Sequence, residues 1–528
     1  MSKKENKQDY KFGANILENL TTGMYQDSKV IYREYIQNSC DSIDKAVKTG
    51  ILKNLKAGEI NLWLDYESRT ISIEDNGTGI SSEEFRNALG DIADSDKKIG
   101  ENKGFRGIGR LCGLAYCKEL VFTSSFKGED IISEMRCDAE RMRILLSENA
   151  KGKKYTASEV LREINKYSTK KTKDINSHFF KVELLGINTE NRDLLDEDEI
   201  RDYLSFVAPV PYQNTFIFRD SIYTHAKKLC AILDEYTIKL EGQQIFKKFK
   251  TYIKGSDDKS HDEIFDIAPH DFYDTNGNLL AWMWIGLSKF KGAIPKTNQM
   301  RGLRLRKENI QLGGEDTLQK LFKEDRGNSY FVGEVFAVSD ELVPNSQRDY
   351  FNENPARAIF EKELSNFFND ELYKLYYNCS AVNSAQKKIE KYENTKAEFN
   401  EKHNKGLFVS DDHRGNELKK VEDAKEEAEA AQKRIEKVKE KANENPNSLI
   451  GKVIKRIETE KSSKSIQVKI ADHVTVTNKP KYRVERLSKY NKNERKLISK
   501  IFDLIIMAIT DSKTADMIIA KIEDGLSQ

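Results

Sequence analysis

Apolar positions along the 528-residue chain change their spacing several times, and each change predicts a different kind of structure. Residues from about 12 to 190 mix amphipathic helix patterns with short β-branched strands. A second mixed region, from about 195 to 355, has strand-like stretches at Thr215–Phe218, Leu280–Leu287 and Tyr330–Val338. These patterns predict two consecutive domains that each combine helices with strands.

The stretch between Pro355 and Pro446 contains no proline and has helical spacing throughout. Apolar residues recur there every three or four positions in two groups, separated by a loop around Gly406–Gly415. Two such seams joined by a turn predict an antiparallel helical hairpin or coiled coil; because the seams are thin, a single exposed helix pair is the alternative. The groups are Val382, Ala385, Ile389, Tyr392 and Phe399, then Leu418, Val421, Ala428, Ile435, Val438 and Ala442.

The tail begins with alternating apolar residues over Ile466–Val476, which is typical of a half-buried β-hairpin. Two apolar helices are predicted after it, at Glu494–Thr510 and Thr514–Ile522. They are too apolar for isolated surface helices, so we expect burial either within the chain or in a dimer interface. The expected domains are therefore 1–190, 191–355, 356–465 and 466–528.

Composition excludes some classes of protein. Lys and Arg number 88 against 86 Asp and Glu, a net charge of +2, which argues against a general coat for nucleic acid or anionic membranes. Local basic patches remain compatible with this total. Two candidate patches are Arg301, Arg304, Arg306 and Lys307, and Lys452, Lys455 and Arg456.

The sequence predicts a soluble, cytoplasmic protein with no membrane segment. Apolar runs such as Ile505–Ile509 are far shorter than the ~18 residues that span a bilayer, and the N-terminus has no apolar signal region. The six cysteines lack metal-type spacing, so we expect them to be reduced and mostly buried.

Three segments in the first region carry candidate chemistry. In the first, Glu34, Asn38 and Asp41 are spaced to project from one face of a helix. A carboxylate beside a carboxamide suits a water-activating base next to a metal ligand. The alternative is an ordinary solvated stripe of polar residues.

The second segment, Ile71–Ile80, is a short strand that runs into a turn. Asp75 at the strand end could accept a hydrogen bond from an exocyclic amine such as that of adenine, while Gly77 and Gly79 permit positive φ and close ligand approach. A plain β-turn of the Asn-Gly type is the alternative.

The third segment, Gly104–Leu114, has glycines before an apolar helix. Backbone N–H groups at the start of such a helix can hold phosphate oxygens. A single glycine triplet is weak evidence. The three segments in this order are strong evidence for a nucleotide site.

Together the segments resemble the N box and the two glycine boxes of the GHKL superfamily of ATPases, which unites DNA gyrase, the ninety-kilodalton heat-shock chaperone, histidine kinases and MutL. The resemblance implies ATP and Mg²⁺ as ligands, with the residue matching Glu34 polarising the attacking water. It implies that Asn38 ligates Mg²⁺ and that Asp75 binds the adenine amino group, under a mobile glycine-rich lid. The nucleotide-binding residues implied are Asn38, Asp41, Asp75, Gly77, Gly79, Ser95, Lys98, Gly104, Phe105, Arg106, Gly107, Ile108 and Gly109.

Two further segments resemble the heat-shock chaperone branch. Leu89–Lys98 is similar to that chaperone's LGTIAKSGT segment, and Leu342–Asp349 is similar to its middle-domain LPLNxSRE loop. The arginine of that loop reaches the γ-phosphate, which makes Arg348 the second catalytic candidate, ahead of Lys296 and Arg301. The alternative for Arg348 is a surface ion pair with a neighbour such as Asp349.

One stretch departs from the family pattern. The family closes this domain with a strand of the form GTxVxL, whereas Phe179–Leu184 has two phenylalanines in place of the Gly-Thr pair. The threonine hydrogen bond near adenine is therefore in doubt. The resemblance covers about residues 12–355.

The resulting expectation is an α+β protein: a two-layer α/β sandwich ATPase domain of the Bergerat type, a small α/β transducer domain, a helical hairpin and a mostly helical tail. We expect a homodimeric clamp that hydrolyses ATP and remodels a protein client or partner subunit. The alternative is a nucleic-acid clamp that binds DNA in chromosome maintenance or antiphage defence. MORC-type ATPases, which share this domain order, are its model.

Overall fold

The computed structural model divides into two compact units, each described by itself. One unit is Met1–Ser288 with Ala293–Asp370, and the other is Lys289–Gly292 with Glu371–Gln528. The residues that the structure describes are 12–21, 23, 27–92, 103, 107–255, 260–462 and 481–527.

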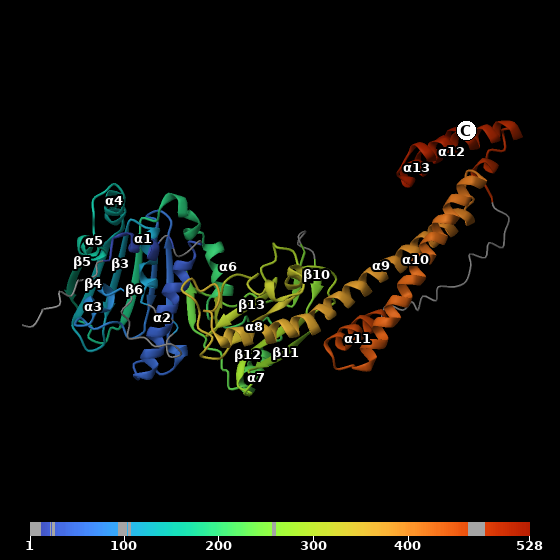
Figure 1. The fold of residues 1–528 in the computed structure, drawn as a ribbon. Helices are drawn as coiled ribbons and strands as arrows, with labels where there is room; N and C mark the ends of the chain where they lie inside the picture. Colours follow the sequence, from blue (N-terminus) through green and yellow to red (C-terminus); the bar gives the residue numbers. More distant parts are fainter. Residues whose placement is uncertain are drawn as a thin grey trace, which may run out of the picture. The chain divides into compact units, whose positions relative to one another are not determined.

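The first unit contains an eight-stranded sheet in which every neighbouring pair of strands is antiparallel except one (Figure 1). The exception is a parallel pair in which Glu59–Leu62 lies beside Thr237–Leu240. In spatial order the strands are β5 (Asn165–Lys171), β4 (Ile131–Asp138), β3 (Glu119–Ser125), β6 (Phe179–Leu185), β2 (Thr70–Asp75), β1 (Glu59–Asp65), β7 (Thr237–Leu240) and β8 (Gln243–Gln244).

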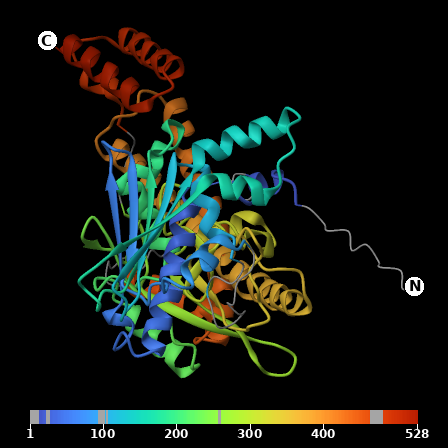
Figure 2. The same ribbon diagram turned by 90° about the vertical axis from the view of Figure 1, so that its left-hand side faces the viewer.

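Helices cover one face of this sheet (Figure 2). Alternate strand residues such as Ile60, Leu62, Ile71 and Ile73 are buried against them, whereas Trp63 points to the other face and is 41% exposed. This two-residue period is that of a sheet covered on one side, and it confirms the predicted α+β class. The helices of this layer are α1 (Asn15–Thr21), α2 (Val30–Lys48), α3 (Phe85–Gly90), the 3₁₀ helix η2 (Gly109–Ala115), α4 (Ala139–Ala150) and α5 (Ala157–Ile164).

Helix α2 is buried around most of its circumference, because it lies against the sheet and also against η2 and α6 (Glu197–Val207). Its apolar residues Ile31, Tyr35, Ile36 and Ile43 belong to the main core. The helix ends where Gly50 takes a φ of 74° and donates its N–H to the Val47 carbonyl. Its polar side chains are therefore held in a fixed frame.

A second, five-stranded sheet follows in the same unit. Two of the expected strands are confirmed as β12 and β15, and the apolar run of β12 is explained by burial on both faces. In spatial order the strands are β11 (Asp266–Tyr273), β12 (Leu279–Leu287), β15 (Val332–Ala337), β13 (Gly302–Lys307) and β14 (Ile310–Leu312). Beside them lie α7 (Arg219–Lys228), α8 (Pro355–Phe367) and a small ladder of β9 (Tyr252–Lys254) and β10 (Ser260–Glu263).

The strand predicted at Thr215–Phe218 is wrong. These residues form turns that lead into α7, and the Phe216 N–H donates to the Gln213 carbonyl at 3.0 Å. Phe216 is fully buried in an aromatic cluster with Phe249 and Trp284. The aromatic residues that favoured a strand therefore fill a core from a turn.

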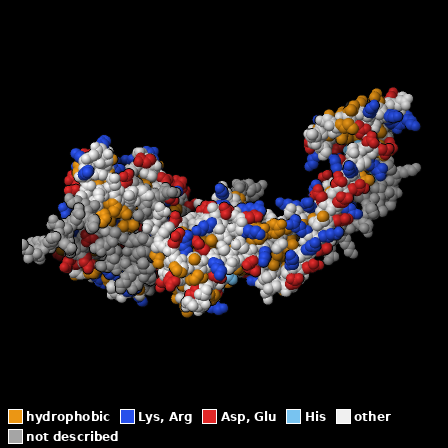
Figure 3. Space-filling model, in the orientation of Figure 1, with side chains coloured by type: hydrophobic (Ala, Val, Ile, Leu, Met, Phe, Trp, Pro, Cys, Tyr) orange, Lys and Arg blue, Asp and Glu red, His pale blue; other side chains and the backbone are white. Residues whose placement is uncertain are grey.

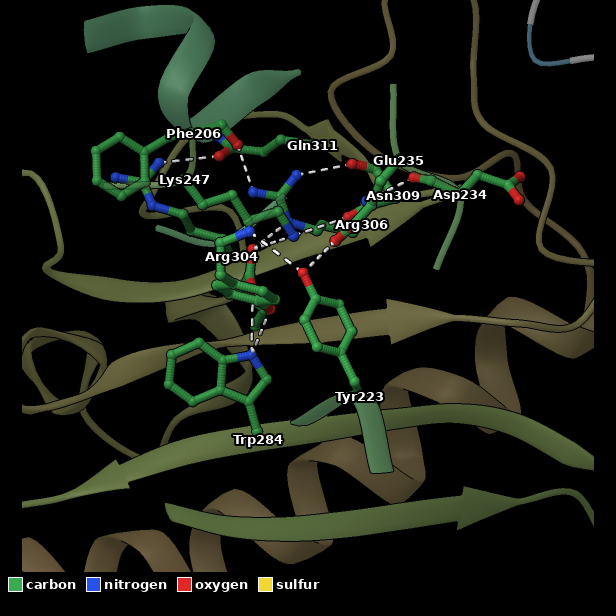
Figure 4. A network of polar contacts seen from close by, with 12 residues as sticks. Phe206, Tyr223, Asp234, Glu235, Lys247, Trp284, Arg304, Arg306, Asn309 and Gln311 are labelled. Carbon is green, nitrogen blue, oxygen red and sulfur yellow. Dashed lines mark hydrogen bonds and ion pairs between the residues drawn. The ribbon is translucent and has the colours of Figure 1, made fainter. Parts of the chain in front are cut away.

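The interior of the second sheet holds a cluster of charged residues (Figure 4). Glu334 on β15 pairs with Arg306 on β13 and lies 3.3 Å from the Lys247 ammonium, and all three side chains are fully buried. Tyr212 also donates to Glu334, and so does the Trp284 indole at 3.1 Å. Burial would raise the pKa of Glu334, but the two cations outweigh it and lower that pKa to about 2.

The second unit is helical in its described residues. The predicted seam residues are buried between two long antiparallel helices, whose ion pairs include Lys388 with Glu427 and Lys402 with Glu417. The second helix begins at Asp411, before Gly415, because Ser410 caps it by accepting from the His413 N–H at 3.0 Å. The helices are α9 (Tyr373–Asn404), α10 (Asp411–Glu444), α11 (Leu449–Ser462), α12 (Lys492–Ala508) and α13 (Ser512–Ser527).

The tail follows the prediction where it is described. The two expected apolar helices are present as α12 and α13, whereas the predicted hairpin over Ile466–Val476 lies outside the described residues. Among the described residues no helix is long and apolar enough to cross a membrane. Five of the six cysteines are buried as expected, and Cys230 is exposed.

The buried charge cluster generates a stability prediction. We expect Glu334→Gln to lower the free energy of unfolding of the second sheet by about 3–5 kcal/mol, because it leaves Arg306 and Lys247 buried without an anion. Two of the three tryptophans, Trp282 and Trp284, lie in this sheet, so intrinsic fluorescence during urea unfolding reports on it. Glu140→Gln, which breaks an exposed pair with Lys118, is the control. Equal effects of the two substitutions would contradict the prediction.

Candidate nucleotide site

The predicted face of α2 is present in the structure. Glu34 and Asp41 are 8% and 5% exposed, and Asn38 between them is half-buried. Oε1 of Glu34 lies 3.3 Å from the guanidinium of its neighbour Arg33. The three polar residues therefore occupy the inner part of the domain, which disfavours the solvated-stripe alternative.

Asp75 lies at the end of β2 and is 1% exposed. Its Oδ1 accepts from the Gly77 N–H at 2.9 Å, whereas its buried Oδ2 has no hydrogen-bond partner among the described residues. Burial raises the pKa of Asp75 to about 7, although the Gly77 N–H and the nearby side chains of Ser39 and Ser42 act in the opposite direction. A buried carboxylate oxygen without a donor suits a ligand that supplies one.

The two glycines after Asp75 stand where no side chain fits. A Cβ on Gly77 would lie 2.0 Å from the Ser42 hydroxyl, and one on Gly79 would lie 2.0 Å from the Ser125 carbonyl. Gly79 also has a φ of 66°, which L-residues rarely adopt. Close packing of the turn against α2 and β3 therefore requires both glycines.

The third segment meets α2 at Glu34. A Cβ on Gly109 would lie 2.4 Å from Oε2 of Glu34, so the last predicted glycine lies directly against this carboxylate. Gly107 takes a φ of 67°, and Ile108 precedes η2. The expected α-helix is instead the 3₁₀ helix η2, whose Gly113 packs so tightly on the Tyr35 hydroxyl that a Cβ would lie 2.4 Å from it. Ser95, Lys98, Gly104, Phe105 and Arg106 lie outside the described residues.

Lys103, which the sequence did not single out, joins several parts of the site. Its backbone N–H donates to Oδ1 of Asp41 at 2.7 Å, and its carbonyl accepts from Gln37 and Arg348. Its ammonium lies 2.7 Å from Asp44. A lysine in a polar stretch carries no pattern that marks such a role.

Arg348 reaches the first domain from the second region of the chain. It is buried, which is contrary to the surface ion-pair alternative, and it has a φ of 55°. Arg33 donates to the carbonyls of Gln347 and Arg348 at 3.1 and 3.5 Å. The loop that carries Arg348 is thus attached next to Glu34, whose carboxylate also contacts Arg33.

The departure from the family strand pattern lies beside Asp75. Phe180 on β6 pairs with Asp75 on β2 and stacks on Phe122, so no threonine hydroxyl is available at this point. Ser124 lies nearby, where it accepts from the Ile80 N–H at 2.8 Å. His178, before β6, contacts the Gly77 carbonyl at 2.8 Å. These hydroxyl and imidazole groups were not identified from the sequence.

The first predicted basic patch is wrong. Arg306 is fully buried with Glu334, and the Lys307 ammonium donates to the Ser339 carbonyl at 2.8 Å. Arg304 is 5% exposed, lies over the Phe206 ring and donates to Gln311 at 2.9 Å. These side chains form an interior network because β13 is a central strand that is buried on both faces.

Lys296 and Arg301, the other candidates for the role of Arg348, line a cleft. Lys296 and Arg301 border an 800 Å³ cleft with Arg33, Arg304 and Gln347. Arg301 lies 3.4 Å from Asp316. These cations are therefore close to the loop of Arg348.

The residues present fit an adenine nucleotide. Asp75 offers an unsatisfied acceptor for an amino group, and the glycines allow close backbone approach. Asn38 is the side chain that would hold Mg²⁺, since its amide oxygen is a hard ligand. Among the described residues no cluster of three His, Cys, Asp or Glu side chains could hold a metal ion on its own.

Comparison with known proteins gives one family and several relatives. The family model described as "Histidine kinase-, DNA gyrase B-, and HSP90-like ATPase" matches residues 25–171. The chaperone protein HtpG of Rhizobium etli is 38% identical over 104 residues, 18% of this chain and 16% of its own length. HtpG of Wigglesworthia glossinidia brevipalpis is 24% identical over 309 residues, which are 53% of this chain and 42% of that protein. HtpG of Halalkalibacterium halodurans is 26% identical over 263 residues, which are 43% of this chain and 40% of that protein. The chain thus spans less than half the length of these relatives.

Asp75 generates a prediction on stability. Its pKa is raised from 3.8 to about 7, so the ionised carboxylate destabilises the fold, and the destabilisation grows as pH rises from about 4 to 7. We expect Asp75→Asn to raise the free energy of unfolding of the nucleotide-free protein at pH 8, by up to about 4 kcal/mol. The gain should shrink at pH 5. Urea unfolding at the two pH values measures it, and a gain independent of pH would contradict the prediction.

Proposed function

Because residues 25–171 match the family model of the histidine kinase, gyrase B and HSP90-like ATPases, we propose that this chain is a Mg²⁺-dependent ATPase that works as a dimeric clamp on a protein client. The observation that carries the proposal is the buried Oδ2 of Asp75, which has no hydrogen-bond donor among the described residues. An adenine amino group supplies the donor that this oxygen lacks.

Glu34 is proposed to orient and deprotonate the attacking water. Its carboxylate is 8% exposed and lies against Gly109, so it stands beside the backbone that would hold the phosphates. Arg33 contacts one carboxylate oxygen at 3.3 Å and thereby restricts its rotation. The other oxygen remains directed toward Gly109. A fixed base next to a phosphate site is what in-line attack by water requires.

Arg348 is proposed to stabilise charge on the transferred phosphoryl group. Its loop is attached to the first domain through Arg33, whose guanidinium bonds two successive carbonyls of that loop. Mg²⁺, when bound at Asn38, would neutralise part of the phosphate charge. A cation from a separate loop makes the active arrangement depend on how the two regions meet.

Helix α12 supports dimerisation. Phe502 packs with Ile519 of α13 and Val409, whereas the opposite side of α12 exposes a stripe at helical spacing. Figure 3 shows hydrophobic side chains gathered over these helices. A stripe of this kind matches an isologous contact between two copies. Its members are Leu497, Ile501, Leu504 and Met507, with exposures of 62, 45, 59 and 76%.

A protein client is favoured over nucleic acid. The relatives found are named chaperones, and the larger of the two basic patches that motivated a DNA clamp is interior. The second patch, on α11, includes Arg456 bonded to Glu460 at 3.0 Å. The first of these basic groups therefore gives no support to the MORC-type alternative, and part of the charge of the second is neutralised by Glu460.

Removal of the proposed base separates binding from hydrolysis. We expect Glu34→Ala to reduce ATP turnover by at least about 100-fold, because a positioned base contributes that much or more. Affinity for a non-hydrolysable ATP analogue should remain, whereas Asp75→Asn should weaken it. Steady-state phosphate release and isothermal titration measure the two quantities.

Glu163→Ala is the matched control for this experiment, since it removes a glutamate that pairs with Arg141 at 3.1 Å on the surface of the same domain. It should leave turnover and affinity unchanged. Wild-type analogue affinity in Asp75→Asn would refute the adenine assignment, and undiminished turnover in Glu34→Ala would refute the base.

The exposed stripe gives a prediction on oligomeric state. Leu504→Glu should convert a dimer to a monomer at micromolar concentration, because it places a charge in an apolar contact. Light scattering with and without the ATP analogue gives the mass. Ile232→Glu, at a residue 78% exposed in the first unit, is the control and should leave the dimer intact. A wild-type monomer in both states would contradict the clamp.

A further inference from the structure

Lys103, just before the glycine-rich segment, is held by several contacts to the rest of the protein. Its side chain is 5% exposed, which is unusual for a lysine. The ammonium lies 2.7 Å from Asp44 on α2 and 3.2 Å from Asp234, in the segment before β7. It also lies 5.2 Å from the centre of the Tyr236 ring, whose hydroxyl donates to Asp44 at 2.6 Å.

The charge on Lys103 is well compensated. Burial alone would lower the pKa of this lysine, but Asp234 and Asp44 raise it above the ordinary value. The ammonium therefore stays charged at all physiological pH values. A buried, paired cation holds its partners in a defined geometry, and removing it leaves the carboxylates of Asp44 and Asp234, which are 20% and 43% exposed, without their shared cation.

The contacts of Lys103 continue into the second sheet. The Asp234 carbonyl accepts from the Asn309 amide at 2.7 Å, and Oδ1 of Asn309 accepts from the Lys247 ammonium at 2.8 Å (Figure 4). Asn309 and Glu308 form the turn between β13 and β14, with φ values of 60° and 53°. Such left-handed residues persist where the surroundings determine them. A continuous polar chain thus runs from Lys103 to the buried cluster of Glu334.

The backbone of Lys103 faces the proposed catalytic groups. Its N–H donates to Asp41 at 2.7 Å, and its carbonyl accepts from the guanidinium of Arg348. The side chain and the backbone of one residue therefore contact different partners. The side chain determines where the carbonyl lies, and the carbonyl contributes to where the Arg348 guanidinium lies.

We propose that Lys103 is a positioning residue that links the glycine-rich segment to the second sheet through Asp234 and so aligns Arg348 for phosphoryl transfer. This role rests on the proposed ATPase function and goes beyond it. Lys103 itself need not touch the nucleotide. Its ammonium acts on Asp44 and Asp234, and its effect reaches the reaction through the carbonyl that Arg348 contacts.

The alternative is a purely structural ion pair. In that case removal of Lys103 would lower stability, and turnover would fall only as far as folded protein is lost. A positioning role instead predicts a fall in kcat with little change in nucleotide affinity, similar in kind to that of Arg348→Ala. Effects at Lys103 and Asp234 should also be non-additive, because both residues belong to one path.

The test uses the full chain with Lys103→Met, Asp234→Asn, the double variant and Arg348→Ala. We expect kcat for ATP to fall about tenfold in Lys103→Met and about threefold in Asp234→Asn. The double variant should be no slower than Lys103→Met alone. Affinity for a non-hydrolysable ATP analogue, measured by titration at a temperature where each variant is folded, should change less than twofold in all.

The matched control is Lys248→Met, which removes a lysine that pairs with Asp202 of α6 from the same second region. It should leave kcat unchanged. Multiplicative effects of the two substitutions, or an unchanged kcat in Lys103→Met, would overturn the role of Lys103. Because Asp234 is 43% exposed, its variant should fold even where Lys103→Met does not, and an unchanged kcat there would overturn the link to the second sheet.

Different results would refute the proposed ATPase function and the positioning role of Lys103. A wild-type chain that neither binds the analogue nor releases phosphate would refute the ATPase itself. Turnover in the wild type together with equal turnover in Lys103→Met would refute the positioning role alone.

Discussion

The polar contacts that α2 makes with backbone groups hold the candidate site together. Through Asp41 and Gln37 the helix holds Lys103, through Glu34 it lies on Gly109, and through Ser42 it lies on Gly77. Because α2 is buried on most sides, these side chains cannot rearrange independently of the core. Two segments from different parts of the sequence are thus aligned by one helix. Loss of its apolar packing would therefore affect the site as well as stability.

The sequence predicted the helices and strands whose residue types repeat at a regular short spacing. The helical spacing of Glu34, Asn38 and Asp41 was enough to place them on one face, and the turn with two glycines that follows the short strand was enough to place Asp75 at a strand end. The strand predicted at Thr215–Phe218 was wrong because residue type alone is ambiguous there: aromatic residues favour strands, but they can also fill a core from a turn. In both cases local pattern predicts local structure, and packing decides the remainder.

Residues that act through distant partners could not be predicted. Lys103 meets Asp44 and Asp234, which are far from it in the chain, and no local pattern encodes such contacts. The prediction of a basic patch at β13 was wrong for a related reason. From sequence alone, these cations look solvated, whereas their counter-ion Glu334 comes from β15. Which residues pair across a sheet depends on the order of its strands, so these ion pairs can be identified only when the strand order is known.

The parallel contact of β7 with β1 has a consequence for how the chain can be divided. β7 comes from beyond residue 190, yet it covers the edge of β1 in the same sheet. A fragment cut after the family match would leave the backbone groups of β1 open to pairing with other molecules. A stable fragment that contains the nucleotide domain therefore has to include β7, which closes this edge of the sheet.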